Sequence, residues 1–118
     1  VTTLLGRRRY LPELMVETDK AKRSPAYRSA ARMAMNTPVQ GSSADILRLA
    51  MLRVDELLCS KFPECSMVLQ IHDELVFEGP GSQLEDLQVQ VVDLMEGVVE
   101  LKVPLVVHPC IGTIWSDL

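Results

Sequence analysis

The amino-acid sequence predicts an α+β fold in which an antiparallel sheet, containing a hairpin with candidate catalytic residues, packs against long helices. A segment from Val39 to about Ser60 has apolar residues three and four positions apart, which is typical of a helix with one buried face. Two short runs of alternating character, residues 67–71 and 75–78, follow it with only three residues between them. Another helical pattern and another apolar run come next. This order of helix, strand, strand, helix and strand is typical of an α+β layer.

The length and composition fit one folded domain. The chain has 118 residues, of which 47% are hydrophobic and 24% are charged, enough for a modest core. No run approaches the roughly 18–20 apolar residues of a membrane-spanning helix, so no membrane partner is expected. The three cysteines form no C-x-x-C pair and are odd in number, which disfavours a zinc site and a disulfide framework and favours an intracellular location. Because the chain begins at Val1 and not at a methionine, we expect a fragment of a longer protein.

The net charge of −4 conceals an uneven distribution along the chain. Residues 1–53 contain ten Lys and Arg against four Asp and Glu, a net charge of +6. Residues 54–118 contain two bases against twelve acids, a net charge of −10. A basic half and an acidic half favour a polyanion on one face and cations near the other. The alternative is two solvated faces that merely differ in charge.

The N-terminal region predicts a ribbon and a helix. Residues 1–5, the basic residues 6–9 and then residues 10–12 are typical of a two-stranded ribbon with an arginine-rich turn, and the polar residues 15–24 predict a loop. Ser24-Pro25 combines an N-cap residue with a first-turn proline and predicts a helix that ends at about Met35.

Asn36-Thr37-Pro38 predicts a break between that helix and the next. Asparagine tolerates the left-handed conformation at a helix end, and Thr-Pro can begin a new helix. The helix from Val39 to about Ser60 then opens with the small residues 41–44, which allow a neighbouring backbone, a strand or a bulky ligand to come close. Its apolar stripe consists of Ile46, Leu47, Ala50, Met51, Val54, Leu57 and Leu58.

The region after the hairpin predicts one more helix and one more strand. Residues 79–82 end the hairpin, and a helix is expected from about Gln83 to Val98. Residues 104–111 form an apolar run that predicts a last strand, and Gly112 to Trp115 close the chain.

The tripeptide His72-Asp73-Glu74 lies at the tip of the predicted hairpin, where backbone on both sides holds its carboxylates. A metal ion in phosphoryl transfer takes oxygen ligands, only a few of them from protein. Adjacent strand residues point to opposite faces, so Asp73 and Glu74 ligate one ion together only if the turn bends sharply. The sequence offers no second inward-facing aspartate, and we expect this chain alone to bind metal very weakly. The alternative is a solvated hairpin tip.

Two sets of donors are candidates for nucleic-acid contacts. Arg32, Asn36 and Gln40 are spaced four residues apart and would form one stripe on a continuous helix, although Pro38 bends the path. Such side chains can donate to the acceptors that every base pair shows in the minor groove. The arginines at positions 7, 8 and 9 are candidates for neutralising phosphates. The alternatives are a helix cap with solvated side chains for the first set and a solubilising loop for the second.

Four motifs, in the right order, resemble the C-terminal part of the family A DNA polymerases, the group typified by bacterial DNA polymerase I. The first resembles the ribbon after the fingers, the second the long palm helix, the third motif C and the fourth the closing residues. They are Leu5-Gly6-Arg7-Arg8-Arg9-Tyr10-Leu11-Pro12, Arg32-x-Ala34-x-Asn36-x-Pro38-x-Gln40-Gly41-x-x-Ala44-Asp45, Gln70-Ile71-His72-Asp73-Glu74-Leu75 and Gly112-x-x-Trp115. The resemblance implies that residues 1–118 are the C-terminal palm portion of a larger polymerase domain, with about 1–35 at the edge of the fingers.

The resemblance also implies roles for individual residues. Asp73 would be a catalytic residue, one of two aspartates that hold a pair of Mg²⁺ ions, and Glu74 would be a supporting, dispensable catalytic carboxylate. The residues implied to contact the primer–template terminus from the minor-groove side are Arg32, Asn36, Gln40 and His72, and Arg9 would touch template phosphate. The implied reaction is the attack of a primer 3′-hydroxyl on a deoxynucleoside triphosphate, with release of pyrophosphate. The implied partners are primer–template DNA, dNTP and the rest of the polymerase domain, in a DNA-containing compartment of the cell.

The chain departs from the family pattern in three places. Ala31 stands where the family usually has a glutamate before the arginine, and neither the motif A aspartate nor the nucleotide-gripping helix of the fingers has a counterpart. We therefore expect the chain alone to be inactive. Two other functions stay open: a metal-dependent nuclease or phosphatase, which needs a second ligand cluster, and a non-catalytic α+β interaction module.

Overall fold

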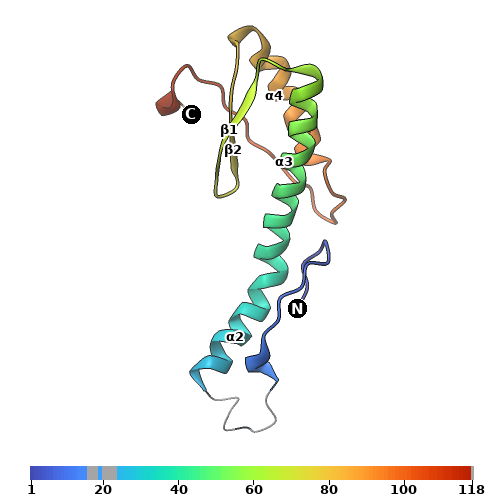
Figure 1. Ribbon diagram of the computed structural model, residues 1–118, viewed down its shortest axis with the longest axis vertical. Coiled ribbons are helices and arrows are strands. Elements are labelled where there is room, and N and C mark those ends of the chain that lie inside the picture. Colours follow the sequence, from blue (N-terminus) through green and yellow to red (C-terminus); the bar gives the residue numbers. More distant parts are fainter. Residues whose placement is uncertain (16–18, 20–23, 118) are drawn as a thin grey trace. The chain divides into compact units, whose positions relative to one another are not determined.

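The computed structural model describes residues 1–15, 19 and 24–117, which form two compact units, Val1–Ile46 and Leu47–Leu118 (Figure 1). Most of the loop expected over residues 15–24 lies outside the described residues. The first unit contains eight Lys and Arg against four Asp and Glu, so the basic part of the sequence largely coincides with it. Within the described ranges no helix combines the length and apolar character needed to cross a membrane.

The first unit contains a shorter ribbon than the one expected. Its two arms meet in a single antiparallel bridge, between Thr2 and Arg8. The backbone N–H of Thr3 donates to the Arg7 carbonyl at 2.9 Å, and that of Arg9 donates to the Val1 carbonyl at 2.8 Å. Gly6 has a φ of 87°, a conformation that glycine adopts without steric cost, and the chain therefore reverses within a few residues. The returning arm is thus residues 7–9 and not residues 10–12, which lead into the 3-10 turn η1 (Pro12–Leu14).

Helix α2 (Pro25–Asn36) confirms the predicted first helix. Pro25 occupies the first turn, where a missing N–H costs nothing, and the Ser24 hydroxyl accepts a hydrogen bond from the Tyr27 N–H at 3.2 Å. The helix begins at the residue that the sequence predicts, but the helical path does not end near Met35 as expected.

The expected break at Asn36 is wrong. Asn36 is right-handed, with φ −81° and ψ −29°, and the chain continues through a π-helical turn, η2 (Thr37–Gly41), into helix α3 (Ser42–Lys61). Pro38 lacks an N–H and its ring clashes with the carbonyl four residues earlier in an α-helix. A π turn, with i to i+5 hydrogen bonds, is a wider path that continues the helix through this position.

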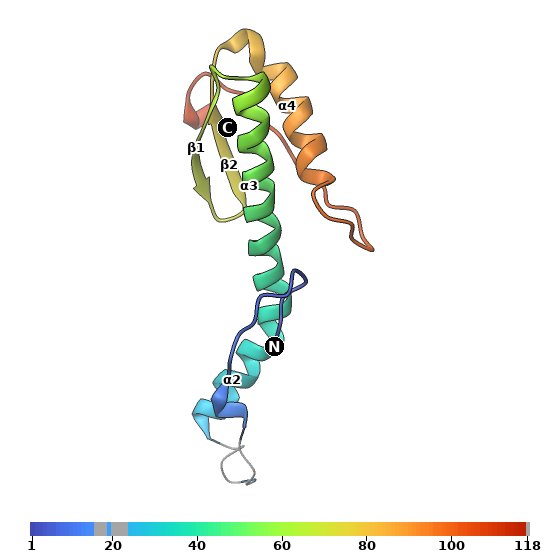
Figure 2. The same ribbon diagram turned by 45° about the vertical axis from the view of Figure 1, so that its right-hand side comes forward.

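The second unit is built from the later part of α3, the hairpin strands β1 (Ser66–Ile71) and β2 (Glu74–Glu78), and helix α4 (Gly81–Glu96). Both views show the hairpin and α4 beside the C-terminal part of α3 (Figures 1 and 2). The shared core consists of Val54, Leu58, Phe62, Cys65, Leu87 and Val91, with Met67 and Phe77 of the hairpin packed against it. Val54 and Leu58 lie on the predicted stripe of the long helix, whereas Leu87 and Val91 come from α4. The predicted α+β fold with an antiparallel hairpin against a long helix is confirmed.

The last predicted strand, residues 104–111, is wrong. In the part of the chain that the structure describes, the sheet has two strands, β1 and β2, and residues 104–111 are irregular. A strand needs a partner edge as well as an apolar pattern, and prolines 104 and 109 have no N–H to donate to one. This segment is instead bonded to α4, because the Val107 N–H donates to the Glu96 carboxylate at 2.8 Å. The chain then ends in a short 3-10 turn, η3 (Trp115–Asp117).

Candidate metal ligand and nucleic-acid interface

The hairpin turn consists of only two residues, His72 and Asp73, because Ile71 pairs directly with Glu74. His72 has a φ of 53°, the left-handed conformation that a tight hairpin loop requires and that histidine adopts more readily than most residues. The Gln70 side-chain amide donates to the His72 carbonyl at 2.8 Å, and this bond ties the turn to β1. The backbone of the turn is therefore fixed on both sides of Asp73.

The base of the same hairpin is anchored in the core. Met67 pairs with Phe77, and both side chains pack against the apolar cluster. The register shifts between Met67 and Leu69, so Val68 is an extra residue on β1. Such a bulge increases the local twist and changes the direction of the side chains beyond it. The anchored base and the bulge together determine the direction of the hairpin turn relative to the core of the second unit.

Asp73 and Glu74 are both exposed. Glu74 opens β2 and Asp73 lies in the turn directly before it. Among the described residues there is no group of three or more His, Cys, Asp or Glu side chains that could hold a metal ion. At the hairpin tip the candidate metal donors are therefore one exposed carboxylate on a fixed turn and a second carboxylate next to it.

Arg32, Asn36 and Gln40 are exposed along one continuous helical path. Four residues in α geometry exceed one full turn by about 40°, so Asn36 is displaced from Arg32 around the axis by that angle. Between Asn36 and Gln40 the path is π-helical, and a π turn takes about one residue more than an α turn. Four residues then fall short of a full turn, which moves Gln40 back toward the line of Arg32. The π turn therefore keeps the three donors in a narrower row than a straight α-helix would.

The three ribbon arginines differ in their surroundings. Arg7 forms an ion pair with Asp45, with 2.8 Å between Nε and Oδ1, and donates to the Gly41 carbonyl at 3.2 Å. Arg9 donates to the Thr37 hydroxyl at 3.4 Å and lies 3.0 Å from the Met33 sulfur. Arg8 is exposed, and its backbone forms the bridge to Thr2. The ribbon is therefore more than a solubilising loop, because two of its arginines fasten it to the helix.

The predicted site residues fall in both units. Arg9, Arg32, Asn36 and Gln40 belong to the first unit, where the bond from Arg9 to Thr37 brings the ribbon to the π turn that contains Gln40. His72, Asp73 and Glu74 belong to the second unit, where the hairpin turn places them next to one another.

Comparison with known proteins decides the family, because the family model described as DNA polymerase family A matches residues 1–117. The chain belongs to DNA polymerase family A. The resemblance inferred from the four sequence motifs is thereby confirmed.

Individual family A members are similar over nearly the whole chain. DNA polymerase I of Bacillus caldotenax is 45% identical over 118 residues, which cover 99% of this chain and 13% of that protein. The thermostable DNA polymerase I of Thermus thermophilus is 42% identical over 120 residues, which cover 98% of this chain and 13% of that protein. A solved structure, the POL domain of Pol1 from M. smegmatis in complex with DNA primer-template and dNTP, is 39% identical with a TM-score of 0.78 and covers 88% of this chain. The family A chain thus spans about an eighth of the length of these curated relatives.

Sequence reasoning missed three features of this family A chain: the pairing of Arg7 with Asp45, the π turn, and the left-handed His72. A partial signal was present for the first, since Asp45 is an acid directly before the apolar stripe of α3 and such a residue needs a basic partner. Nothing in the sequence distinguishes Arg7 from Arg8 as that partner. The small residues at the start of the long helix did signal a close approach, and the structure identifies the approaching group as Thr3 of the ribbon.

Proposed function

We propose that this chain is the C-terminal palm portion of a longer family A DNA polymerase, with about residues 1–35 at the edge of the fingers, and that the longer protein carries out template-directed DNA synthesis. The observation that carries the proposal is the fixed two-residue turn at the hairpin tip, which presents the exposed Asp73 in a chain 45% identical to DNA polymerase I. The reaction is the attack of a primer 3′-hydroxyl on a deoxynucleoside triphosphate, with release of pyrophosphate. The protein would work in a DNA-containing compartment of the cell.

The chemistry of the donor set fits one part of a magnesium site. Mg²⁺ is commonly held by one or two carboxylates, with water and substrate phosphates as the other ligands, so one aspartate from this chain suffices if another comes from elsewhere in the protein. Asp73 would be that ligand. Bound Mg²⁺ would supply charge stabilisation for phosphoryl transfer at a two-metal site.

The residues of this chain would hold and orient the reactants. The hairpin turn would hold the backbone of Asp73, and with it the carboxylate, within a narrow range of positions. The bond from Gln70 and the core-anchored strands limit movement of this turn. Glu74 would add negative charge beside it. His72 would contact the primer–template terminus from the same turn.

The donor row of the first unit would bind the duplex. Arg32, Asn36 and Gln40 can each donate to purine N3 or pyrimidine O2, acceptors present in every base pair, and would therefore sense pair geometry without reading sequence. Arg9 would contact a template phosphate with the donors that its bond to Thr37 leaves available. The complex of the M. smegmatis domain with primer-template DNA and dNTP supports this assignment of ligands.

The test is primer extension by the full-length protein that contains this sequence. Asp73→Asn should lower the extension rate by at least about a thousandfold, equivalent to roughly 4 kcal/mol of transition-state stabilisation, while DNA affinity changes little. Glu74→Gln should have a much smaller effect. Glu78→Gln is the matched control, because Glu78 is an exposed carboxylate at the far end of β2 and the substitution removes the same charge.

Near-normal extension by Asp73→Asn would refute the assignment of Asp73. Metal-dependent cleavage of DNA without extension by the wild type would favour a nuclease instead. Neither extension nor cleavage, with DNA or a protein still bound, would favour the non-catalytic interaction module.

A further inference from the structure

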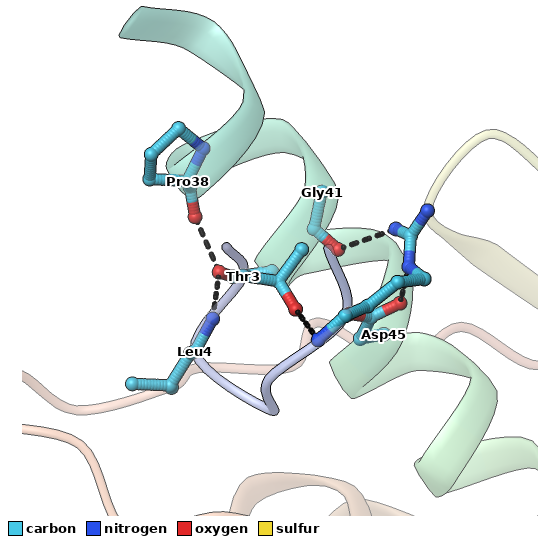
Figure 3. Close-up of polar contacts among 7 residues, drawn as sticks. Thr3, Leu4, Pro38, Gly41 and Asp45 are labelled. Carbon is cyan, nitrogen blue, oxygen red and sulfur yellow. Dashed lines mark hydrogen bonds and ion pairs between the residues drawn. The ribbon is translucent and has the colours of Figure 1, made fainter. Parts of the chain in front are cut away.

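A polar clamp joins the ribbon to the π turn in the first unit. The backbone N–H of Leu4 donates to the Ser42 hydroxyl at 2.7 Å, and that hydroxyl donates in turn to the Pro38 carbonyl (Figure 3). Arg7 donates to both Asp45 and the Gly41 carbonyl, and its own N–H donates to the Thr3 hydroxyl at 3.0 Å. The ribbon therefore contacts both ends of the turn that contains Gln40.

The contact between ribbon and turn is also sterically close. A Cβ atom added at Gly41 would lie 2.8 Å from the Cγ2 atom of Thr3 and 3.5 Å from Nη2 of Arg7. Thr3 is only 6% exposed and its hydroxyl accepts the bond from the Arg7 N–H, so its side chain has little room to move away. Only a glycine at position 41 allows the ribbon to come this close.

The strongest bond of the clamp is the ion pair of Arg7 with Asp45. Asp45 is 9% exposed and Arg7 is 52% exposed at the side chain, so the pair is partly shielded from water. A hydrogen bond between charged groups is worth more than a neutral one, and more when it is shielded. Because Arg7 also bonds Gly41, one guanidinium connects the start of α3 to the last residue of η2.

We propose that Arg7 is a positioning residue: through Asp45 and Gly41 it holds the π turn, and with it the Gln40 side chain, in the geometry that senses the primer–template terminus. A π turn is a rare path that persists where the surroundings favour it. Without the clamp the segment 37–41 can shift toward α geometry or become dynamic, and Gln40 then leaves the row that it shares with Asn36 and Arg32. This inference rests on the proposed function.

The first test measures discrimination in the full-length protein. Arg7→Gln and Arg8→Gln each remove one positive charge from the same ribbon, so their general effects on DNA affinity and its salt dependence should be similar. Arg7→Gln should additionally lower the preference for extending a paired over a mispaired primer end, by about tenfold relative to Arg8→Gln, as expected for the loss of a charged hydrogen bond. Arg7→Lys keeps the charge but cannot reach both acceptors at once, and should be intermediate.

A double-mutant cycle with Gln40→Ala shows whether Arg7 acts through Gln40. If it does, Arg7→Gln should cost little further discrimination once Gln40 is absent. Full additivity of the two substitutions, or equal discrimination by Arg7→Gln and Arg8→Gln, would overturn the proposal.

Amide hydrogen exchange distinguishes failure of this proposal from failure of the proposed function. The amides of residues 39–42 should exchange faster in Arg7→Gln than in the wild type and Arg8→Gln, whether or not the protein synthesises DNA. Unchanged exchange there would refute the clamp itself. Faster exchange in a protein that does not extend primers would leave the clamp intact and refute the polymerase assignment alone.

Discussion

Gly79 follows strand β2 directly and packs against the core, so its substitution should loosen the hairpin that carries Asp73. A Cβ atom at this position would lie 2.4 Å from the Cys65 sulfur, 3.1 Å from its Cβ and 3.3 Å from its Cα. Cys65 is 5% exposed within the apolar cluster and its sulfur lies 3.5 Å from the Gln83 amide oxygen, which restricts its movement. Overpacking of this kind costs about 1–3 kcal/mol. Gly79→Ala should therefore destabilise the second unit by an amount in this range.

Native-state hydrogen exchange at the amides of β1 and β2 measures this loss locally. The expected cost corresponds to a decrease in protection of about five- to 150-fold. Gly81→Ala is the control: an added Cβ there meets nothing within 4 Å, and Gly81 opens α4, where alanine has the higher helix propensity. Removing the sulfur with Cys65→Ala should relieve the shortest contact, so the double variant with Gly79→Ala should lose less than the sum of the two. The reasoning fails if Gly79→Ala keeps hairpin protection within about twofold of the wild type, or if Gly81→Ala loses as much.

Two further predictions concern the helices. Val54 is 0% exposed in the core, so Val54→Ala should lower stability by about 2 kcal/mol. Leu52 lies on the same helix with its side chain 65% exposed, so Leu52→Ala should change the stability by less than about 0.5 kcal/mol. Equal shifts in the thermal unfolding temperature of the two variants would contradict the burial of Val54 in the core. Ser24→Ala should weaken the start of α2 by about 1 kcal/mol, because it removes the acceptor of the Tyr27 N–H. Faster exchange limited to the first turn of α2 is the expected observation, and unchanged exchange there would argue against the cap.

The local elements of this chain are predictable from its sequence. The apolar stripe with Val54 and Leu58 places one face of α3 in the core, and the cap at Ser24 fixes the start of α2. The hairpin follows from two alternating runs with a short separation. In each case the information lies within a few turns or a few strand residues, where periodicity and capping act directly.

The candidate site is predictable as a set of residue types and less so as a geometry. The sequence identifies an exposed aspartate at a hairpin tip, and the structure adds that the turn has two residues, a left-handed His72 and a bond from Gln70. It likewise identifies the donors Arg32, Asn36 and Gln40 without showing how they align. Their roles in binding DNA and metal stay predictions until they are tested as above.

The sequence by itself determined the start of α2, the buried face of α3, the hairpin and the motifs of family A. The tertiary structure alone decided that the helical path continues through Pro38, that residues 104–111 form no strand, and that Arg7 pairs with Asp45. The physical reason is the range of the interactions involved. Helical periodicity and turns depend on neighbours in sequence, whereas a strand needs a partner edge and the π turn is held by bonds from a ribbon more than thirty residues away.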